Sequence, residues 1–227
     1  MDNPAKLLIQ FPTRERPQKF LMVAKKYMDF MEDKKNWIMN VSCDDNDFTM
    51  NDPKMINKIY DTFGDHVRIN FNPNKNKHEA CNADISSFTF DIVLLASDDM
   101  IPKEVGYDNI IRKYFSMYFP NFDGVLHFDD GHQHDKLNTL SILGRKYYDR
   151  FGYIYNQEYI SLWADAEFDM ISRILGKRKY IERVIIKHEH PNIVTTVPYD
   201  ELYRKNDSAE LHDRSVFFKR KAINFNL

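Results

Sequence analysis

The chain has 227 residues, and its 32 Lys and Arg against 34 Asp and Glu give a formal net charge of −2. Because positive and negative side chains are almost equal in number, the protein has no overall electrostatic field that would favour nucleic acid or an anionic membrane as a partner. The two cysteines give neither a disulfide framework nor a zinc site, and no apolar run is long enough to span a bilayer. We therefore expect a soluble, cytoplasmic, globular protein without stable membrane insertion.

The first half of the chain alternates short apolar runs with amphipathic stretches, which is the pattern of parallel strands joined by helices. Apolar runs predict strands at 7–11, 37–42, 67–71 and 90–96, and apolar residues at helical spacing predict helices at 17–31 and 53–63. Between the last two strands we expect a polar loop at 72–78 and a short helix at 80–88. Residues 1–103 are therefore predicted to form a Rossmann-like α/β half.

The second half has a less regular pattern. We expect a helix at 109–119, a strand at 124–128, a short apolar run at 140–143, a helix at 163–175 and a late strand at 183–188. Because no low-complexity linker separates the halves, residues 104–227 are expected to extend the same sheet. The whole chain, 1–227, is therefore predicted to be a single domain.

Polar clusters follow three of the predicted strands: Thr13-Arg14-Glu15-Arg16, Asp44-Asp45-Asn46-Asp47 and Ser97-Asp98-Asp99. Ligands of open parallel sheets bind at the carboxyl ends of the strands, so we expect these clusters to line one site. Neither a Gly-x-Gly-x-x-Gly motif nor a P-loop accompanies them. Their absence disfavours a dinucleotide site and a Walker-type phosphate site.

Asp98 and Asp99 form the pair of adjacent carboxylates that follows the most apolar predicted strand. Two neighbouring carboxylates are costly to hold together unless a cation or hydrogen bonds compensate their charge. A hard divalent ion that takes few protein ligands and completes its shell with phosphate oxygens fits such a pair. The alternative is a turn or a helix cap, since Asp favours both and Pro102 follows. On this pattern alone the two interpretations are equal.

Two further clusters bear on this choice. His188 and His190 alternate along the predicted late strand, so both would face one side, and imidazole is a good ligand for Mn²⁺. Asp165 and Glu167 lie at the start of a predicted helix. A first-turn acidic pair is typical of helix starts, because it complements the helix dipole, but it could also supply a general base.

The second strand-end cluster, with Asp44 and Asp45, could cap the following helix or accept a hydrogen bond from a nucleobase. Arg14 and Arg16 could pair with these carboxylates or with a diphosphate. Lys77, in the predicted polar loop, could also reach phosphate.

In this order the motifs resemble the GT-A fold of nucleotide-sugar glycosyltransferases, most closely family 2 and its relatives in bacteria and large DNA viruses. Phe11-Pro-Thr-Arg-Glu-Arg-Pro17 resembles the first strand and donor loop of that family, and Val41-Ser-Cys-Asp-Asp-Asn46 its base-binding acidic stretch. Leu94-Leu-Ala-Ser-Asp-Asp-Met100 takes the place of its Asp-x-Asp metal motif. Trp163-Ala-Asp-Ala-Glu-Phe168 is similar to its catalytic-base motif, and His188-Glu-His-Pro191 to its late metal-binding histidine.

The resemblance implies a metal-dependent glycosyltransferase of hexosyltransferase type that moves a sugar from a nucleoside-diphosphate-sugar, in most members a UDP-sugar, to an acceptor hydroxyl. Its cofactor would be Mn²⁺ or Mg²⁺, bound by Asp99 with His188 or His190. The donor would be held by the strand-end clusters, through Pro12, Thr13, Arg14, Arg16, Asp44, Asp45, Lys77, Ser97 and Asp98. Asp165 or Glu167 would be the catalytic base of an inverting reaction. A retaining reaction in the same fold stays open, because no sequence feature fixes the stereochemistry.

This chain departs from the family pattern at two places. Ser97 stands where a strict Asp-x-Asp motif has its first Asp, so the resemblance favours Asp99 as the metal ligand and Asp98 as a contact to the sugar or ribose. The base motif is Asp165-Ala-Glu167, so the identity of the base stays open. The segment 128–132, Phe-Asp-Asp-Gly-His, is expected to line the side of the cleft that takes a glycan or another hydroxyl acceptor.

Two other functions remain compatible with the pattern. A nucleotidyltransferase also combines a Rossmann-like half with carboxylates and Mg²⁺, but it normally has a Gly-rich loop after the first strand, where this chain has Pro12-Thr-Arg-Glu-Arg16. A non-catalytic relative of the same fold could bind a glycan or a protein partner. Release of pyrophosphate would identify the former, and lack of metal-dependent nucleotide binding the latter.

Overall fold

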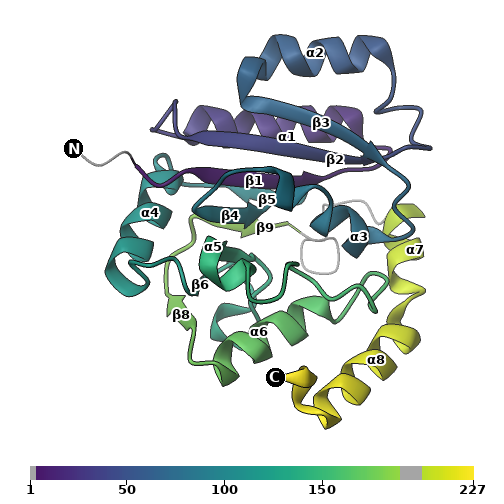
Figure 1. The fold of residues 1–227 in the computed structure, drawn as a ribbon. Helices are drawn as coiled ribbons and strands as arrows, with labels where there is room; N and C mark the ends of the chain where they lie inside the picture. The colour runs from purple at the N-terminus through teal and green to yellow at the C-terminus, as the bar shows by residue number, and fades with distance from the viewer. Residues whose placement is uncertain (1–3, 190–200) are drawn as a thin grey trace.

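A computed structural model describes residues 4–189 and 201–227. A seven-stranded sheet forms the centre, with strand order β3-β2-β1-β4-β7-β6-β8 (Figure 1). Its strands are β1 (Leu7–Pro12), β2 (Trp37–Asp44), β3 (Val67–Asn72), β4 (Ile92–Leu95), β6 (Val125–Phe128), β7 (Ile142–Gly144) and β8 (Arg178–Ile181). β7 runs antiparallel to both of its neighbours, whereas β3, β2, β1 and β4 are parallel to one another. The predicted α/β fold is confirmed.

The helices lie on both faces of this sheet (Figure 1). On one face α1 (Pro17–Phe30), α2 (Pro53–Phe63) and α4 (Tyr107–Tyr118) contribute to one hydrophobic core, which also contains alternate residues of β1, such as Ile9. On the other face α5 (Arg145–Tyr148), α6 (Ala164–Ile174) and α8 (Glu210–Ala222) belong to a second core, which contains Leu8. Successive side chains of a strand point to opposite faces, so β1, buried on both, is apolar almost throughout.

β6, β7 and β8 of the second half extend the sheet of the first half, as predicted, whereas the predicted late strand does not. Five further elements were not predicted: the strands β5 (Met100–Pro102) and β8, and the helices α5, α7 (Glu201–Asp207) and α8. β5 pairs with β9 (Ile186–His188) in a separate two-stranded antiparallel ribbon. None of the helices in the described part of the chain could cross a membrane, since each is too short or too polar.

A ladder of amide side chains positions α3 (Lys77–Asn82) under the sheet. Asn70 donates to Asn40 and Asn40 donates to Gln10, each at 2.8 Å. The Gln10 amide in turn donates to the backbone carbonyl of Ala80 at 3.2 Å. Because Gln10 and Asn40 are fully buried, these hydrogen bonds satisfy groups that would otherwise be costly to bury. They fix the helix that begins with Lys77.

The prediction of a polar loop over 72–78 is wrong for its first residue and its last two, because β3 ends at Asn72 and α3 begins at Lys77. Asn76 is its N-cap and accepts a hydrogen bond from the Glu79 backbone at 2.9 Å. Asn followed three residues later by Glu is a helix-start signal that this segment contains.

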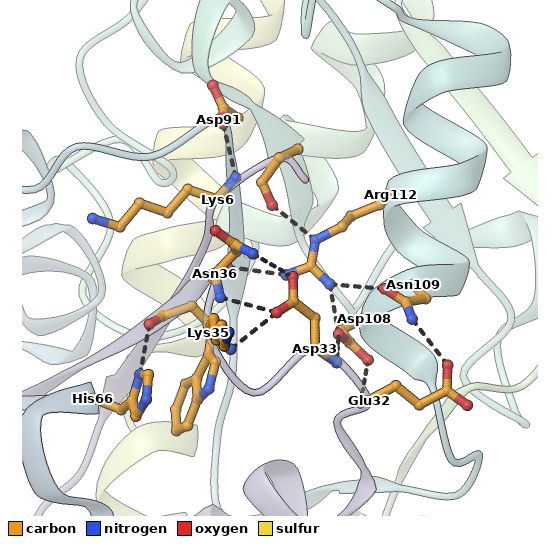
Figure 2. A network of polar contacts seen from close by, with 12 residues as sticks. Lys6, Glu32, Asp33, Lys35, Asn36, His66, Asp91, Asp108, Asn109 and Arg112 are labelled. Carbon is orange, nitrogen blue, oxygen red and sulfur yellow. Dashed lines mark hydrogen bonds and ion pairs between the residues drawn. The ribbon is translucent and has the colours of Figure 1, made fainter. Parts of the chain in front are cut away.

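Arg112 of α4 closes the opposite, amino edge of the sheet. Its guanidinium donates to the backbone carbonyls of Ala5 at 2.8 Å and Asn36 at 3.0 Å, which precede β1 and β2. Asp108 and Asp33 balance its charge (Figure 2). Because ligands of open α/β sheets bind at the carboxyl edge, this buried network stabilises the fold and leaves the chemistry to the other edge.

Candidate functional site

Hydrogen bonds join the carboxyl ends of β1, β2 and β4, so the three polar clusters form one surface. Beyond β1, the Thr13 backbone N–H donates to Ser42 at 3.0 Å. The Glu15 backbone N–H, in the next turn, donates to the Asp47 carboxylate at 2.7 Å. Asp47 also accepts from the Thr49 hydroxyl at 2.7 Å, which holds the loop after β2 closed. The structure thus gathers the strand-end segments as the sequence predicted.

Arg14 and Asp44 form an ion pair at the end of β2. Arg14 also donates to the Asn46 side chain at 2.9 Å, and the second oxygen of Asp44 accepts from the Asn74 amide at 3.0 Å. Asp45 is exposed beside them. Helix α2 is capped by Asp52, not by this cluster, so the capping interpretation is wrong and these polar groups face the edge of the sheet.

Two cations of α1 and its preceding loop surround Asp98. Arg16 lies 3.1 Å from its carboxylate and Lys19 lies 3.2 Å from it. Burial raises the pKa of Asp98, although both cations oppose that shift. Lys19 was not predicted as a site residue, yet it stands one helical turn after Arg16, where a side chain covers the same surface.

Asp99 and His188 come together from segments that are far apart in the sequence. β5 and β9 pair so that Met100 lies opposite His188, and the Glu189 backbone N–H donates to the Asp99 carbonyl at 2.7 Å. His188 Nε2 then lies 3.7 Å from Asp99 Oδ2. Burial alone would raise the pKa of Asp99, but the imidazole, the Ser97 hydroxyl and the Lys77 ammonium outweigh it and hold that pKa well below its usual range.

The donor set around Asp99 fits a divalent cation. Carboxylate and imidazole are both ligands of Mn²⁺, and a carboxylate kept ionised is ready to bind it. In residues 4–189 and 201–227, no three or more His, Cys, Asp or Glu side chains gather as a metal site would require. Asp99 and His188 would therefore supply a minority of the ligands, as in sites that substrate phosphate completes. His190 lies outside the described residues.

Asp165, in the first turn of α6, stands apart from these groups but within their electrostatic reach. Burial raises its pKa, whereas the Ala166 N–H, Lys77 and His188 oppose that shift. Lys77 acts on both Asp165 and Asp99 in the same sense. The half-buried Asp165 carboxylate and Asp99 therefore both lie within electrostatic reach of Lys77.

Helix α8 holds the segment that leads into Asp165. Asp213 accepts hydrogen bonds from three successive backbone N–H groups, those of residues 160–162, at 2.7 to 2.9 Å. Trp163 follows with φ of 63°, a left-handed conformation that costs energy in a bulky residue. Its indole N–H donates to Glu210 at 2.9 Å, which anchors it. Strain of this kind is found at functional sites.

The carboxylate of Glu167 is bound by two other side chains and has a structural role. It lies on the buried side of α6, bonded to the Arg220 guanidinium at 2.8 and 3.0 Å and to the Tyr159 hydroxyl at 2.6 Å. Glu167 is 2 % exposed. A carboxylate so enclosed has no approach for an acceptor, so of the two predicted base candidates we retain Asp165.

Breaking the Glu167–Arg220 ion pair should destabilise the fold without removing a catalytic group. We expect Arg220→Ala to lower the free energy of unfolding by about 3–5 kcal/mol, because it leaves a buried, uncompensated carboxylate. Urea unfolding measures the loss, and the double variant Glu167→Leu/Arg220→Leu should recover much of it. If Glu167→Gln stays folded and binds its ligands normally but loses all turnover, Glu167 is the base after all.

Sequence reasoning missed the contribution of Asn74 and of Asp130 to this edge. Asn74 binds Asp44, and Asp130 follows β6 with one carboxylate oxygen 3.9 Å from His188 Nδ1. Both contacts join residues separated by 30 or more positions, so periodicity could not reveal them. Asp130 was expected only as part of the acceptor side.

No protein-family model and no curated protein matches this sequence. Solved structures match it over most of its length. The mannosyltransferase PcManGT from Pyrobaculum calidifontis, in complex with GDP-Man and Mn²⁺, aligns with a TM-score of 0.67 at 12% identity, over 88% of this chain and 59% of that one. S. aureus TarS 1-349 in complex with UDP-GlcNAc aligns with a TM-score of 0.62 at 12% identity, over 88% and 64%.

The chain thus spans about three fifths of the length of these two structures. At this identity the likeness establishes the arrangement of the backbone, which includes the parallel β3-β2-β1-β4 half and the strands that continue its sheet. The chain therefore has the GT-A fold of nucleotide-sugar glycosyltransferases.

Proposed function

We propose that this protein transfers a sugar from a nucleoside-diphosphate-sugar to an acceptor hydroxyl in a metal-dependent reaction. The observation that carries the proposal is the convergence, at the carboxyl edge of a GT-A sheet, of an ionised Asp99 beside His188 with a separate, half-buried Asp165. Such a transfer requires one acidic site that holds a diphosphate through a cation and a second that takes a proton.

The donor would lie across the ends of β1, β2 and β4. Asp44 would accept a hydrogen bond from the base, a role that suits uracil and guanine because each carries a ring N–H next to a carbonyl. Arg16, Lys19 and Lys77 supply positive charge for the diphosphate, and Arg14 orients Asp44. Other backbone and side-chain contacts to the donor would come from Pro12, Thr13, Asp45, Ser97 and Asp98.

Asp99, His188 and His190 would hold Mn²⁺ or Mg²⁺, with diphosphate oxygens completing the shell. A bound divalent cation supplies charge neutralisation for the departing nucleoside diphosphate. Neighbouring solved structures contain GDP-Man with Mn²⁺ in one protein and UDP-GlcNAc in another. We propose a UDP-sugar as the donor and treat a GDP-sugar as the competing outcome.

Asp165 would act as the general base. Its carboxylate takes the proton of the acceptor hydroxyl while that oxygen forms a bond to the anomeric carbon and the bond from this carbon to the diphosphate breaks. The raised pKa of Asp165 suits this role, because a base works best when its pKa approaches the operating pH. Attack from the face opposite the leaving group gives inversion.

Binding of the donor is the first test. Thermal unfolding with UDP-glucose, UDP-GlcNAc or GDP-mannose should show a rise in Tm that requires Mn²⁺, because a ligand that binds only the folded state stabilises it. At a ligand concentration of 100 times Kd the stabilisation is about 2.7 kcal/mol. ADP-glucose serves as the control, because adenine has no ring N–H for Asp44.

The products then separate the remaining alternatives. Transfer or hydrolysis would release a nucleoside diphosphate, whereas a nucleotidyltransferase would release pyrophosphate. A protein that binds a glycan but shows no nucleotide-sugar binding with either Mn²⁺ or Mg²⁺ would be a non-catalytic member of the fold, and the proposed function would be wrong.

A further inference from the structure

The outer face of helix α8, which lies at the periphery of the molecule (Figure 1), is apolar along its centre. Leu211 and Phe218 are seven residues apart, almost two helical turns, so they lie on the same side of the helix, and Ala222 follows one turn later. All three are exposed, Leu211 to 82 % and Phe218 to 51 %. The opposite side of α8 packs into the fold and holds the buried residues Asp213, Val216, Phe217 and Arg220. Attachment of α8 to the fold therefore does not use its outer apolar residues.

Further exposed apolar residues lie next to this stripe. Ile223 and Leu227, which follow α8, are exposed to 58 % and 44 %. The Phe218 ring also lies 6.0 Å from the Trp163 ring, centroid to centroid. Single exposed apolar residues are ordinary on a protein surface, whereas a series of them on one element is typical of an interaction site.

The charged side chains exposed within residues 211–227 are all basic. Arg214 and Lys221 lie on one side of the apolar stripe, and Lys219 lies on the other. The one acid of this segment, Asp213, is buried. The segment contains four Lys or Arg and one Asp, whereas the whole chain has 32 Lys and Arg against 34 Asp and Glu. The even charge of the whole chain therefore does not describe this surface.

An anionic lipid surface fits the outer face of α8 better than a nucleic acid or a second copy of the chain does. Basic side chains beside an apolar stripe can place their charges among lipid headgroups while the apolar side chains enter the boundary with the acyl chains. Nucleic acid would be held through its phosphates and would leave the apolar centre in water. Two copies joined symmetrically through this face would bring the same basic side chains together, which costs free energy.

We propose that the outer face of α8 binds peripherally to an anionic membrane surface. Leu211 and Phe218 would enter the interface, and Arg214, Lys219 and Lys221 would contact the lipid phosphates. The binding energy would come from the buried apolar area together with attraction to the anionic lipids. Neither a nucleotide-sugar nor a metal ion takes part, so the proposal is independent of the proposed function.

Co-flotation with lipid vesicles tests the proposal directly. The 227-residue chain is mixed with vesicles of phosphatidylcholine alone, or of equal parts phosphatidylcholine and phosphatidylserine, in about 0.05 M salt, where surface charges are weakly screened. We expect binding to the anionic vesicles and about 100-fold weaker binding to the neutral ones, because each basic residue near an anionic surface contributes about 1 kcal/mol. Phosphatidylglycerol should replace phosphatidylserine without loss, since the recognised feature is the charge.

Removal of the basic residues should act in the same direction. The triple variant Arg214→Gln/Lys219→Gln/Lys221→Gln should bind the anionic vesicles about 100-fold more weakly than the unsubstituted protein does. The control removes the same number of charges from other helices, at the exposed lysines Lys54, Lys58 and Lys113. The control variant should bind as the unsubstituted protein does, because these lysines lie outside the proposed surface.

The apolar centre is tested separately. Leu211→Gln should weaken binding to the anionic vesicles about tenfold, since it removes a side chain that would be buried in the interface. Met22→Gln is its control, because Met22 of α1 is exposed to 65 % but lies outside the proposed surface. In Leu211→Trp the added indole should move from water into the interface. Its fluorescence should therefore shift to shorter wavelength when anionic vesicles are added, relative to the unsubstituted protein.

Two results would overturn the proposal once circular dichroism has shown that each variant is folded. In the first, the unsubstituted protein does not bind the anionic vesicles, or the α8 variants bind them as tightly as their controls do. In the second, the unsubstituted protein is a dimer in solution and Leu211→Gln makes it a monomer, which would assign the outer face of α8 to a second copy of the chain.

Discussion

Asp99→Asn should abolish Mn²⁺-dependent binding of the donor and lower kcat/KM by about 10³-fold or more. Charge neutralisation at the diphosphate is worth several kcal/mol, and each 1.4 kcal/mol is tenfold in rate. Asn has the shape of Asp but not its charge, so the substitution removes the negative charge that His188, Ser97 and Lys77 favour. Calorimetry with donor, with and without Mn²⁺, gives the readout.

Asp99→Asn should also lower stability at neutral pH. The folded pKa of Asp99 lies below its unfolded value, so its charge contributes stability above the unfolded pKa, and this contribution is lost as pH falls through the folded pKa. Donor binding must therefore be measured below the melting temperature of the variant.

Asp123→Asn is the control for loss of a buried, paired carboxylate. Asp123 is 6 % exposed and pairs with Arg150 at 2.9 Å and Lys177 at 2.8 Å, but it precedes β6 and so lies at the amino edge of the sheet. The Asp123→Asn substitution should reduce stability and leave the Mn²⁺ dependence of donor binding intact. Full Mn²⁺-dependent binding by Asp99→Asn would remove Asp99 from the metal site.

The strands and helices of the first half could be predicted because their apolar residues recur at the spacing of a strand or a helix. β1, β2 and β4 are mostly apolar and mostly buried, β3 alternates apolar with polar residues, and α1 and α2 carry apolar residues at helical spacing, so local pattern and tertiary environment agree. β8 reads Arg-Lys-Tyr-Ile at the edge of the sheet, where half-buried side chains leave no alternation to detect. β5 has three residues and forms only because β9 returns to pair with it.

The candidate site also has a part that could be predicted from the sequence and a part that could not. The strand-end clusters were predictable because parallel strands bring their carboxyl ends to one edge. The partners of those clusters were not, since Lys19, Asn74 and Asp130 reach them only through the tertiary fold. Glu167 shows the converse: its place in the first turn of α6 was as good a signal as that of Asp165, and only its bond to Arg220 separates the two.

Asp165→Asn should lower kcat by about 10²- to 10⁴-fold, the usual contribution of a general base, with little change in donor affinity. The base is required in its ionised form. Its raised pKa therefore predicts that kcat falls, as the pH is lowered, at a higher pH than an ordinary aspartate would give. The pH profile of kcat with saturating donor reports this pKa, and the acid limb should disappear in the variant.

The same substitution should make the protein more stable at neutral pH, which no structural role for Asp165 would predict. Burial disfavours its charge, so above its unfolded pKa the ionised carboxylate destabilises the folded state, and this penalty disappears as pH falls. Asn has no charge and keeps an oxygen to accept from the Ala166 N–H, which lies 2.8 Å away. A higher Tm together with lost turnover is the signature of a residue retained for chemistry at the expense of stability. A lower Tm with normal turnover would instead make Asp165 an ordinary first-turn acid of α6, and another residue would have to take the proton.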